Sequence, residues 1–272
     1  MTADQGKDRS ALAVFAGELK LARARAGLSQ DQLADKVAYS SSLVAMVEGC
    51  RRVPSRDFSQ RCDEALETGG ALTRLHPLVA GEAYPSWFRP FVELEARAVS
   101  LRSWQPVLVP GLLQTGDYAR AVVRAARPTD PDEQISQLVS ARLERQAILA
   151  RDDPPLLWAV LDETVLRRPV GGRRVIRDQV AHLVAAARQP KIIIQVIPLD
   201  VGANAGMTGA FTIAGFTGTT DTVYLETAAT GLVADHTDTL QACDFTFDTL
   251  RAEAISPSAS LELMMKVADS WT

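Results

Sequence analysis

The sequence predicts two domains: a mainly α N-terminal domain of five helices, and an α+β C-terminal domain whose mixed sheet has about four strands. Two observations carry this prediction. The 272 residues exceed the usual size of a single domain. Up to residue 80 apolar residues recur at helical spacing, whereas from Tyr84 strand-sized apolar runs alternate with helical segments. We expect residues 1–10 to form a disordered tail, 11–80 the first domain and 81–272 the second.

In the first domain, we expect helices at about 11–26, 30–38, 41–47, 55–66 and 72–79. Gly27 follows the first helix, where a left-handed cap favours glycine. Ser29 and Gln32 form a capping-box pattern at the start of the second helix. Ser40 caps the third helix after the short turn "AYS". The second and third helices therefore have the helix-turn-helix arrangement.

In the second domain, we expect helices at about 88–101, 116–126, 132–151, 171–189, 234–254 and 257–268. Four apolar runs bounded by turn residues predict strands: "PPLLWAVLDE", "KIIIQVIPL", "GAFTIAGF" and "DTVYLET". Helices and strands alternate along this part of the chain. We therefore expect one α+β domain.

The composition excludes several classes of protein. Residues 1–80 carry 11 Lys and Arg against 10 Asp and Glu, and residues 81–272 carry 18 against 23, so neither domain is basic overall. The three cysteines form no CxxC pair, and no apolar leader is visible, as expected for a cytoplasmic protein. The three histidines are widely spaced, so we expect no metal site. No apolar run approaches the length of a membrane span.

The stretch "LKLARARAGLSQDQLADKVAYSSSLVAMVEGCRRVPS" resembles the lambda-repressor/Cro class of helix-turn-helix, the XRE family. The resemblance covers about Phe15 to Leu66 and implies binding of double-stranded DNA by a homodimer. It places Gln30 on the DNA backbone and makes Arg23 and Glu48 a structural ion pair between the first and third helices. A helix N-terminus also suits a phosphate oxygen on physical grounds, and Gln30 lies at one. Arg51 and Arg52, in the loop after the third helix, are the expected phosphate anchors, and Arg56 is a further candidate.

The third helix is expected to face the bases. In the register of the family, Val44 and Val47 point inward. The remaining candidates for DNA contact are small or apolar: Ser40, Ser41, Ser42, Ala45 and Met46. None of them is an Arg, Asn or Gln that could contact a base in bidentate fashion. We therefore expect modest intrinsic specificity, which dimerisation or DNA shape would raise.

The second domain resembles the C-terminal domain of unknown function of actinobacterial XRE regulators, including Streptomyces regulators of the WhiJ type. The motifs "VPGLLQTGDYARAVVRAA", "LERQAILARDDPPLLWAVLDETVLRRPVGG", "IIIQVIPLDVGANAGMTGAFTIAGF" and "VYLETAATGLVADHTDTL" carry the resemblance, over about Tyr84 to Ala268. It implies a cytoplasmic regulator, associated with the nucleoid when bound to DNA, from a high-GC actinomycete. It also implies a small acidic partner protein that binds this domain.

Two groups of residues are candidates for contact with a ligand or partner. Tyr84, Trp87, Phe88 and Trp104 form a dense aromatic stretch that either lines a pocket or fastens a helix to the core. Asn204, Met207 and Thr208 lie in a glycine-rich loop that either faces a ligand or merely connects two strands.

We expect no enzyme and no cofactor. The glycine-rich loop lacks the residues of a phosphate-binding loop or a dinucleotide fingerprint, and no GxSxG motif is present. Asp162, Glu163 and Glu226 end predicted strands and could meet above the sheet edge, although carboxylates are also ordinary residues there. His182 lies within a helix and is expected to be a packing or surface residue.

These observations predict a transcription regulator whose second domain mediates dimerisation and receives a small-molecule or small-protein signal. Two alternatives belong to other classes. The first is an antitoxin-like protein that sequesters a small acidic partner. The second is a cryptic enzyme tethered to DNA through the first domain.

Overall fold

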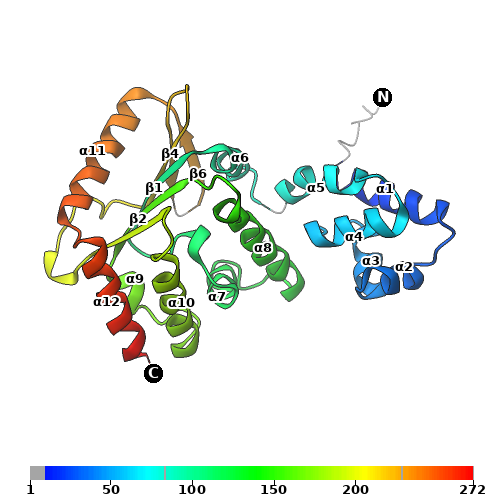
Figure 1. The fold of residues 1–272 in the computed structure, drawn as a ribbon, viewed down its shortest axis with the longest axis horizontal. Helices are drawn as coiled ribbons and strands as arrows, with labels where there is room; N and C mark the ends of the chain where they lie inside the picture. The colour runs from blue at the N-terminus through cyan, green and yellow to red at the C-terminus, as the bar shows by residue number, and fades with distance from the viewer. Residues whose placement is uncertain (1–9, 83, 228, 272) are drawn as a thin grey trace, which may run out of the picture. The chain divides into compact units, whose positions relative to one another are not determined.

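The computed structural model describes residues 10–82, 84–227 and 229–271, without the side chains of residues 80–82 (Figure 1). The chain divides into two compact units. The first contains the described residues up to Ser86 together with Asp132–Ala141, and the second contains Trp87–Pro131 and the described residues from Arg142 onward. The tail predicted for residues 1–10 lies outside the described residues, except for Ser10, which caps the first helix.

The first unit contains the five predicted helices, α1 (Ala11–Arg25), α2 (Gln30–Val37), α3 (Ser41–Glu48), α4 (Arg56–Leu66) and α5 (Ala71–Glu82). Serine side chains cap the first four by accepting a backbone N–H: Ser10, Ser29, Ser40 and Ser55. At Ser29 the complete capping box forms with Gln32. Apolar residues from all five helices form the core: Phe15, Leu19, Leu33, Val37, Val44, Val47, Phe58, Cys62, Leu72 and Val79.

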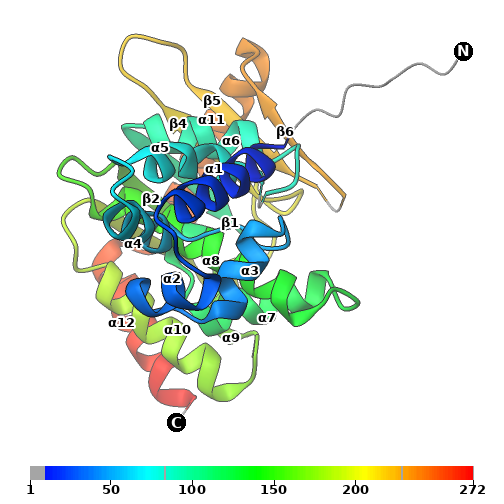
Figure 2. The ribbon, with the colours of Figure 1, turned by 90° about the vertical axis from the view of Figure 1, so that its right-hand side faces the viewer.

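The second unit is built on one six-stranded sheet with the order β3-β2-β1-β4-β5-β6. The strands are β1 (Ser100–Gln105), β2 (Leu156–Asp162), β3 (Ile192–Ile197), β4 (Phe211–Gly215), β5 (Thr222–Glu226) and β6 (Gly231–Ala234). β1, β2 and β3 run parallel, whereas β4, β5 and β6 are antiparallel to their neighbours. β6 forms one border of the sheet (Figure 2).

The helices of the second unit are α6 (Arg89–Arg97), α7 (Gly116–Ala126), α9 (Thr164–Arg167), α10 (Arg173–Ala186), α11 (Thr237–Glu253) and α12 (Pro257–Ser270). α8 (Asp132–Arg145) is divided between the units, because Asp132–Ala141 belongs to the first. Short 3-10 helices occur at η1 (Gly111–Leu113), η2 (Gln146–Ala150) and η3 (Leu199–Val201). One face of the sheet shares a core with α7, α10 and α12, and the other shares a smaller core with α11 (Figure 1). No helix of the described residues is both long and apolar enough to cross a membrane.

The prediction of about four strands was wrong, because β1 and β6 are also strands. β1 was expected to continue a helix to residue 101, since the apolar spacing of "FVELEARAVSL" is helical. The helix ends instead at Arg97, and Ala98 is already extended. β1 reads "SLRSWQ", and β6 has only four residues, so neither is a long apolar run. Both segments are strands because they pair with neighbouring strands, and not because of the pattern of apolar residues within them.

The loop at residues 109–115, within the "VPGLLQT" motif, connects β1 to α7 and needs partners for its irregular backbone. Two glutamines from distant elements provide them. Gln146 donates to two of the loop's carbonyl oxygens, at 3.0 and 2.8 Å. Gln179, which is completely buried on α10, accepts from the Thr115 N–H and donates to the Leu113 carbonyl, both at 2.7 Å. The motif is therefore fixed by side chains that lie far from it in the sequence.

We predict that Gln179→Leu lowers the stability of the second unit. Leucine has a similar volume but leaves two backbone groups without their partner, which costs about 1–3 kcal/mol each. All four tryptophans lie in the second unit, so urea unfolding followed by tryptophan fluorescence measures this unit. Gln241→Leu, at an exposed position of α11, is the matched control and should leave the midpoint nearly unchanged. Equal midpoints for both variants would show that the loop does not depend on Gln179.

Candidate nucleic-acid interface

The turn between α2 and α3 is short, and contacts with α4 fix its position. α2 ends at Ala38, which adopts the left-handed conformation with φ 56°, and Ser40 caps α3 two residues later. Between them, the Tyr39 hydroxyl donates to Asp57 at 2.7 Å. Its ring packs edge-on against buried Phe58, with the ring centroids 5.3 Å apart. The turn is thus anchored to α4.

A buried ion pair joins α1 to the end of α3. The Arg23 guanidinium donates to both Glu48 oxygens, at 2.6 and 2.8 Å, and also to the Leu28 carbonyl at 2.8 Å. The Glu48 side chain is only 3% exposed. The Gln30 amide, at the start of α2, donates to the same carboxylate at 2.7 Å. One carboxylate therefore fixes three helices relative to one another.

The charge on Glu48 is maintained by these bonds. Burial alone would raise the pKa of Glu48, but the hydrogen bonds from Arg23 and Gln30 and the positive charge of Arg23 lower it below its ordinary value of 4.5. The hydrogen bond to Glu48 likewise raises the pKa of Arg23. The pair is ionised at neutral pH.

The outward face of α3 carries the residues that the sequence analysis assigned to it. Val44 and Val47 are completely buried, as predicted. Ser42 is exposed, and Ser41, Ala45 and Met46 are half-buried. Ser40 has a different role from Ser41 and Ser42, because its hydroxyl accepts from the Leu43 N–H as the N-cap and lies 3.0 Å from the Ser42 hydroxyl. α3 thus presents a surface of small and uncharged side chains.

Groups that suit phosphate flank this face. Gln30 is the first residue of α2, where backbone N–H groups have no partner within the helix. One hydrogen of its side-chain amide is used by Glu48, which leaves the other for a ligand. Arg51 is exposed and Arg52 half-buried in the loop after α3. Arg56 is exposed in the first turn of α4, a second helix N-terminus.

A supporting network around Tyr39 was not predicted from the sequence. Arg61, on α4, pairs with Asp57 at 2.9 Å and lies 5.6 Å from the Tyr39 ring centroid. It also donates to the Val37 carbonyl at the end of α2. The i, i+4 spacing of Asp57 and Arg61 was the available signal for a pair. Nothing in the sequence connected that pair to the turn.

The aromatic candidates of the second unit, Trp87, Phe88 and Trp104, do not lie on one face of its sheet. Trp104 is completely buried in the core on the α11 face, whereas Trp87 and Phe88 pack against the core of the opposite face. Tyr84 belongs to the first unit. Phe88 instead packs beside Tyr224, which the sequence analysis did not consider, with ring centroids 5.4 Å apart. Of the two alternatives for these residues, fastening to the core fits Trp87, Phe88 and Trp104.

Trp104 explains the glycine-rich loop at residues 202–210. Its indole N–H donates to the Gly206 carbonyl at 2.8 Å, and a side chain at Gly206 would collide with the indole ring. The Asn204 side chain accepts from the Gly206 N–H at 3.0 Å. Met207 and Thr208 are exposed. The loop is therefore fastened to the core, and only Met207 and Thr208 remain candidates for contact with a partner.

The carboxylates at the strand ends are occupied or separated. One Asp162 oxygen accepts from both the N–H and the hydroxyl of Thr164, at 2.9 and 2.5 Å. Glu163 accepts from Arg167 and from the Leu199 N–H. Glu226 ends β5, which lies three strands from β2, a separation of about 14 Å at the usual strand spacing. The side chains of Asp162 and Glu226 therefore do not meet.

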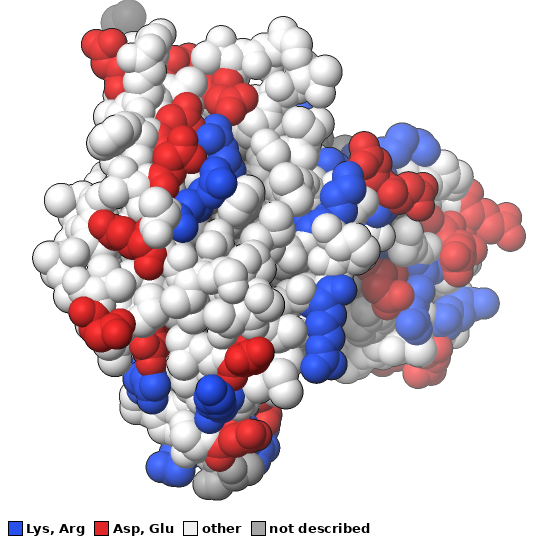
Figure 3. Space-filling model, turned by 60° about the vertical axis from the view of Figure 1, so that its left-hand side comes forward, with Lys and Arg blue, Asp and Glu red and all other residues white. Residues whose placement is uncertain are grey.

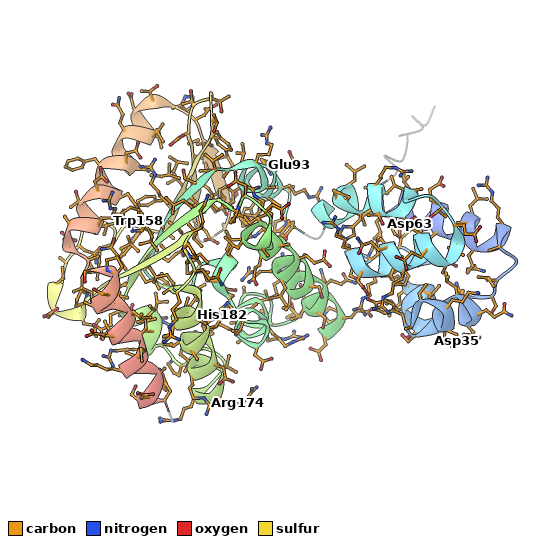
Figure 4. The ribbon with its side chains drawn as sticks, viewed as in Figure 1. Asp35, Asp63, Glu93, Trp158, Arg174 and His182 are labelled. Atoms are coloured by element: carbon orange, nitrogen blue, oxygen red, sulfur yellow. The ribbon has the colours of Figure 1, made fainter. Side chains whose placement is uncertain are left out.

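His182 and the charged residues on one face of the second unit offer no second candidate site among the described residues. His182 is exposed on α10, and burial of part of its ring lowers its pKa (Figure 4). Lys, Arg, Asp and Glu are scattered among uncharged residues on the face of the second unit that Figure 3 shows. No cluster of three or more His, Cys, Asp or Glu residues in the described part of the chain could hold a metal ion.

Each unit contains a segment that matches a known protein family. Residues 14–75 match a helix-turn-helix domain, and residues 88–266 match a domain of unknown function (DUF5753). The second match covers about two thirds of the chain. No curated protein and no solved structure matches the chain.

We predict that Glu48→Gln destabilises the first unit at pH 7 by about 1–3 kcal/mol, because Arg23 keeps its charge but loses a carboxylate partner. The folded-state pKa of Glu48 is lowered, so its contribution is present above pH 4.5 and is lost as the pH falls below that value. Amide hydrogen exchange of α1 and α3 in the full chain measures this unit.

The difference between Glu48→Gln and wild type should therefore shrink as the pH falls. Glu64→Gln, at an exposed position of α4, is the control and should resemble wild type at pH 7. A difference that stays constant down to the lowest pH at which the chain folds would contradict an ionised Glu48 in the folded state.

Proposed function

The chain belongs to the DUF5753 family and carries an XRE-type helix-turn-helix domain at its N-terminal end, and from this premise we propose that it is a sequence-specific, DNA-binding transcription regulator. The observation that carries the proposal is the surface around α3. Its outward residues are small or apolar, while Gln30, Arg51 and Arg56 lie at its margins. Small side chains allow close approach to a DNA groove, and the flanking groups suit phosphates.

In this proposal, phosphate contacts set the position of the protein and α3 contributes the base contacts. The Gln30 amide and the N–H groups at the start of α2 bind one backbone phosphate, and Arg51 and Arg52 bind others. The hydroxyls of Ser41 and Ser42 can bond to several bases, and Ala45 and Met46 suit a thymine methyl. Specificity per contact is therefore modest.

We propose a receiving role, without catalysis, for the second unit. It would mediate dimerisation and bind a signal, either a small molecule or a small protein. Binding there would shift the population of arrangements in which two helix-turn-helix units match the spacing of two half-sites. The engagement of Asp162 and Glu163 by local hydrogen bonds supports a structural role for these carboxylates.

A fluorescence-anisotropy titration tests the proposed function. The purified full chain is titrated against the DNA upstream of its own gene and against a scrambled duplex, at two salt concentrations. Tighter binding to the upstream DNA that persists at the higher salt is the expected result. Equal and salt-sensitive binding to both duplexes would overturn sequence-specific recognition by this chain alone.

We predict that Arg51→Ala weakens binding to all duplexes about equally and lowers the slope of log K against log salt by roughly one unit. The reason is the loss of one phosphate contact. Arg188→Ala, which removes the same charge from an exposed position of the second unit, should leave the slope unchanged.

Ser42→Ala provides the contrast within the same interface. It should preserve the salt slope and change the preference at one base step by at most about 1–3 kcal/mol. A slope for Arg51→Ala equal to that of wild type would show that Arg51 contacts no phosphate.

A further inference from the structure

The two edge strands of the six-stranded sheet, β3 and β6, differ in whether their outward backbone groups have hydrogen-bond partners. At the β3 border, Ile192, Ile194 and Val196 are at most 5% exposed. The N–H and C=O of Val196 point away from the sheet, and both have hydrogen-bond partners. The carbonyl accepts from the Ile255 N–H and the N–H donates to the Ser260 hydroxyl, both at 3.0 Å. Ile255, between α11 and α12, and Ser260 of α12 thus cover this border at Val196.

The β6 border is open in the part of the chain that the structure describes. Leu225 pairs with Leu232 across β5 and β6. The Glu226 N–H points toward β4 and donates to the Ala210 carbonyl. Because backbone directions alternate along a strand, the N–H and C=O of the preceding residue, Leu225, point toward β6 and form hydrogen bonds with Leu232. Directions alternate along a strand, so the backbones of the two residues beside Leu232 point outward, away from the sheet.

These two outward residues are Gly231 and Val233. Among the described groups, the only hydrogen bond to this border is a long one of 3.3 Å, from the Thr230 hydroxyl to the Gly231 carbonyl. Strand borders in soluble proteins usually carry a charge, a proline or a bulge that prevents pairing with another strand. The sequence of β6, "GLVA", contains no charged residue and no proline.

The side chain of Leu232 lies at the centre of this border and is 57% exposed. It shares a sheet face with Leu225, which packs into the core beneath α11. On the other face, the Tyr224 side chain covers Gly231 so closely that a side chain there would collide with its hydroxyl. Position 231 is thereby restricted to glycine, and the border is left without a side chain that could block it.

This border is complementary to itself. About a twofold axis through Leu232, Gly231 of one copy opposes Val233 of the other, and the reverse, which forms four backbone hydrogen bonds in antiparallel register. Leu232 then faces Leu232 of the second copy in the close, non-hydrogen-bonded pair. The twofold axis brings only residue 232 against its own copy, so a charged side chain at this position would repel itself, whereas a leucine does not.

We propose that β6 is the dimerisation edge of this protein, and that its occupant is β6 of a second copy, paired antiparallel about an axis at Leu232. The two sheets then form one continuous twelve-stranded sheet. The inference extends the proposed function by assigning the dimer interface. It does not require DNA binding, because the edge, the register and the exposed leucine belong to the second unit alone.

Sedimentation velocity of the full chain at micromolar concentrations tests the proposal. Wild type should sediment as a dimer. Leu232→Lys and Leu232→Asp should each raise the dimer dissociation constant by about 100-fold, since two buried leucines are replaced by like charges on the axis. Leu199→Lys, at a leucine of the same unit that is 50% exposed, is the matched control and should remain dimeric.

A mixture of the two variants gives the decisive measurement. Only an axis at this position brings residue 232 of one copy against residue 232 of the other, so Leu232→Lys and Leu232→Asp together should restore a 1:1 dimer. Circular dichroism spectra equal to that of wild type establish that both variants fold. A monomeric wild type, a dimer that neither substitution weakens, or variants that stay monomeric when mixed would each overturn the proposal.

Anisotropy with a single half-site duplex reports DNA binding separately, so failure of the dimer edge and failure of the proposed function give different results.

Discussion

The bond between Arg23 and Glu48 is the interaction on which the placement of α3 depends. α3 has only eight residues and two completely buried side chains, so its own packing fixes it weakly. The carboxylate at its last residue binds α1 through Arg23 and α2 through Gln30. Because Gln30 also begins the helix proposed to meet a phosphate, the same carboxylate connects the position of the base-contacting helix to that of a backbone contact. The Glu48 carboxylate thus contributes to the relative placement of three helices as well as to the stability of the first unit.

In the second unit, neutral side chains take the place of the ion pair and fix the position of irregular segments through long-range hydrogen bonds. The parallel strands β1 and β2 require a long crossover, and the crossover begins in an irregular loop whose backbone is buried. Gln146 and Gln179 supply the partners that a regular helix or strand would have supplied itself. Trp104 does the same for the loop before β4. In both units, long-range polar contacts decide where the irregular segments lie.

These contacts also explain which features the sequence could predict. The helix boundaries in the first unit follow from local rules, because each serine cap and its helix are neighbours in the chain. The Arg23–Glu48 pair required the family resemblance, since 25 residues separate the partners. β1 and β6 escaped prediction because their identity as strands comes from pairing. The aromatic residues were grouped by proximity in sequence, although Trp87 and Phe88 precede α6 and pack on one face of the sheet, whereas Trp104 in β1 packs on the other.

The uncharged face of α3 and the uncharged border of β6 are connected by one physical argument. Two hydroxyls, a methyl group and a thioether distinguish base pairs weakly, so one copy gains little discrimination from α3. Discrimination increases when a second copy is held at a fixed distance, because the second half-site is then bound in an effectively intramolecular step. That gain is lost if the connection between the copies is loose. A strand-to-strand interface has a register set by backbone hydrogen bonds and therefore one orientation, whereas an apolar patch of similar size tolerates several. A directional edge is thus the kind of interface from which a weakly discriminating helix gains most.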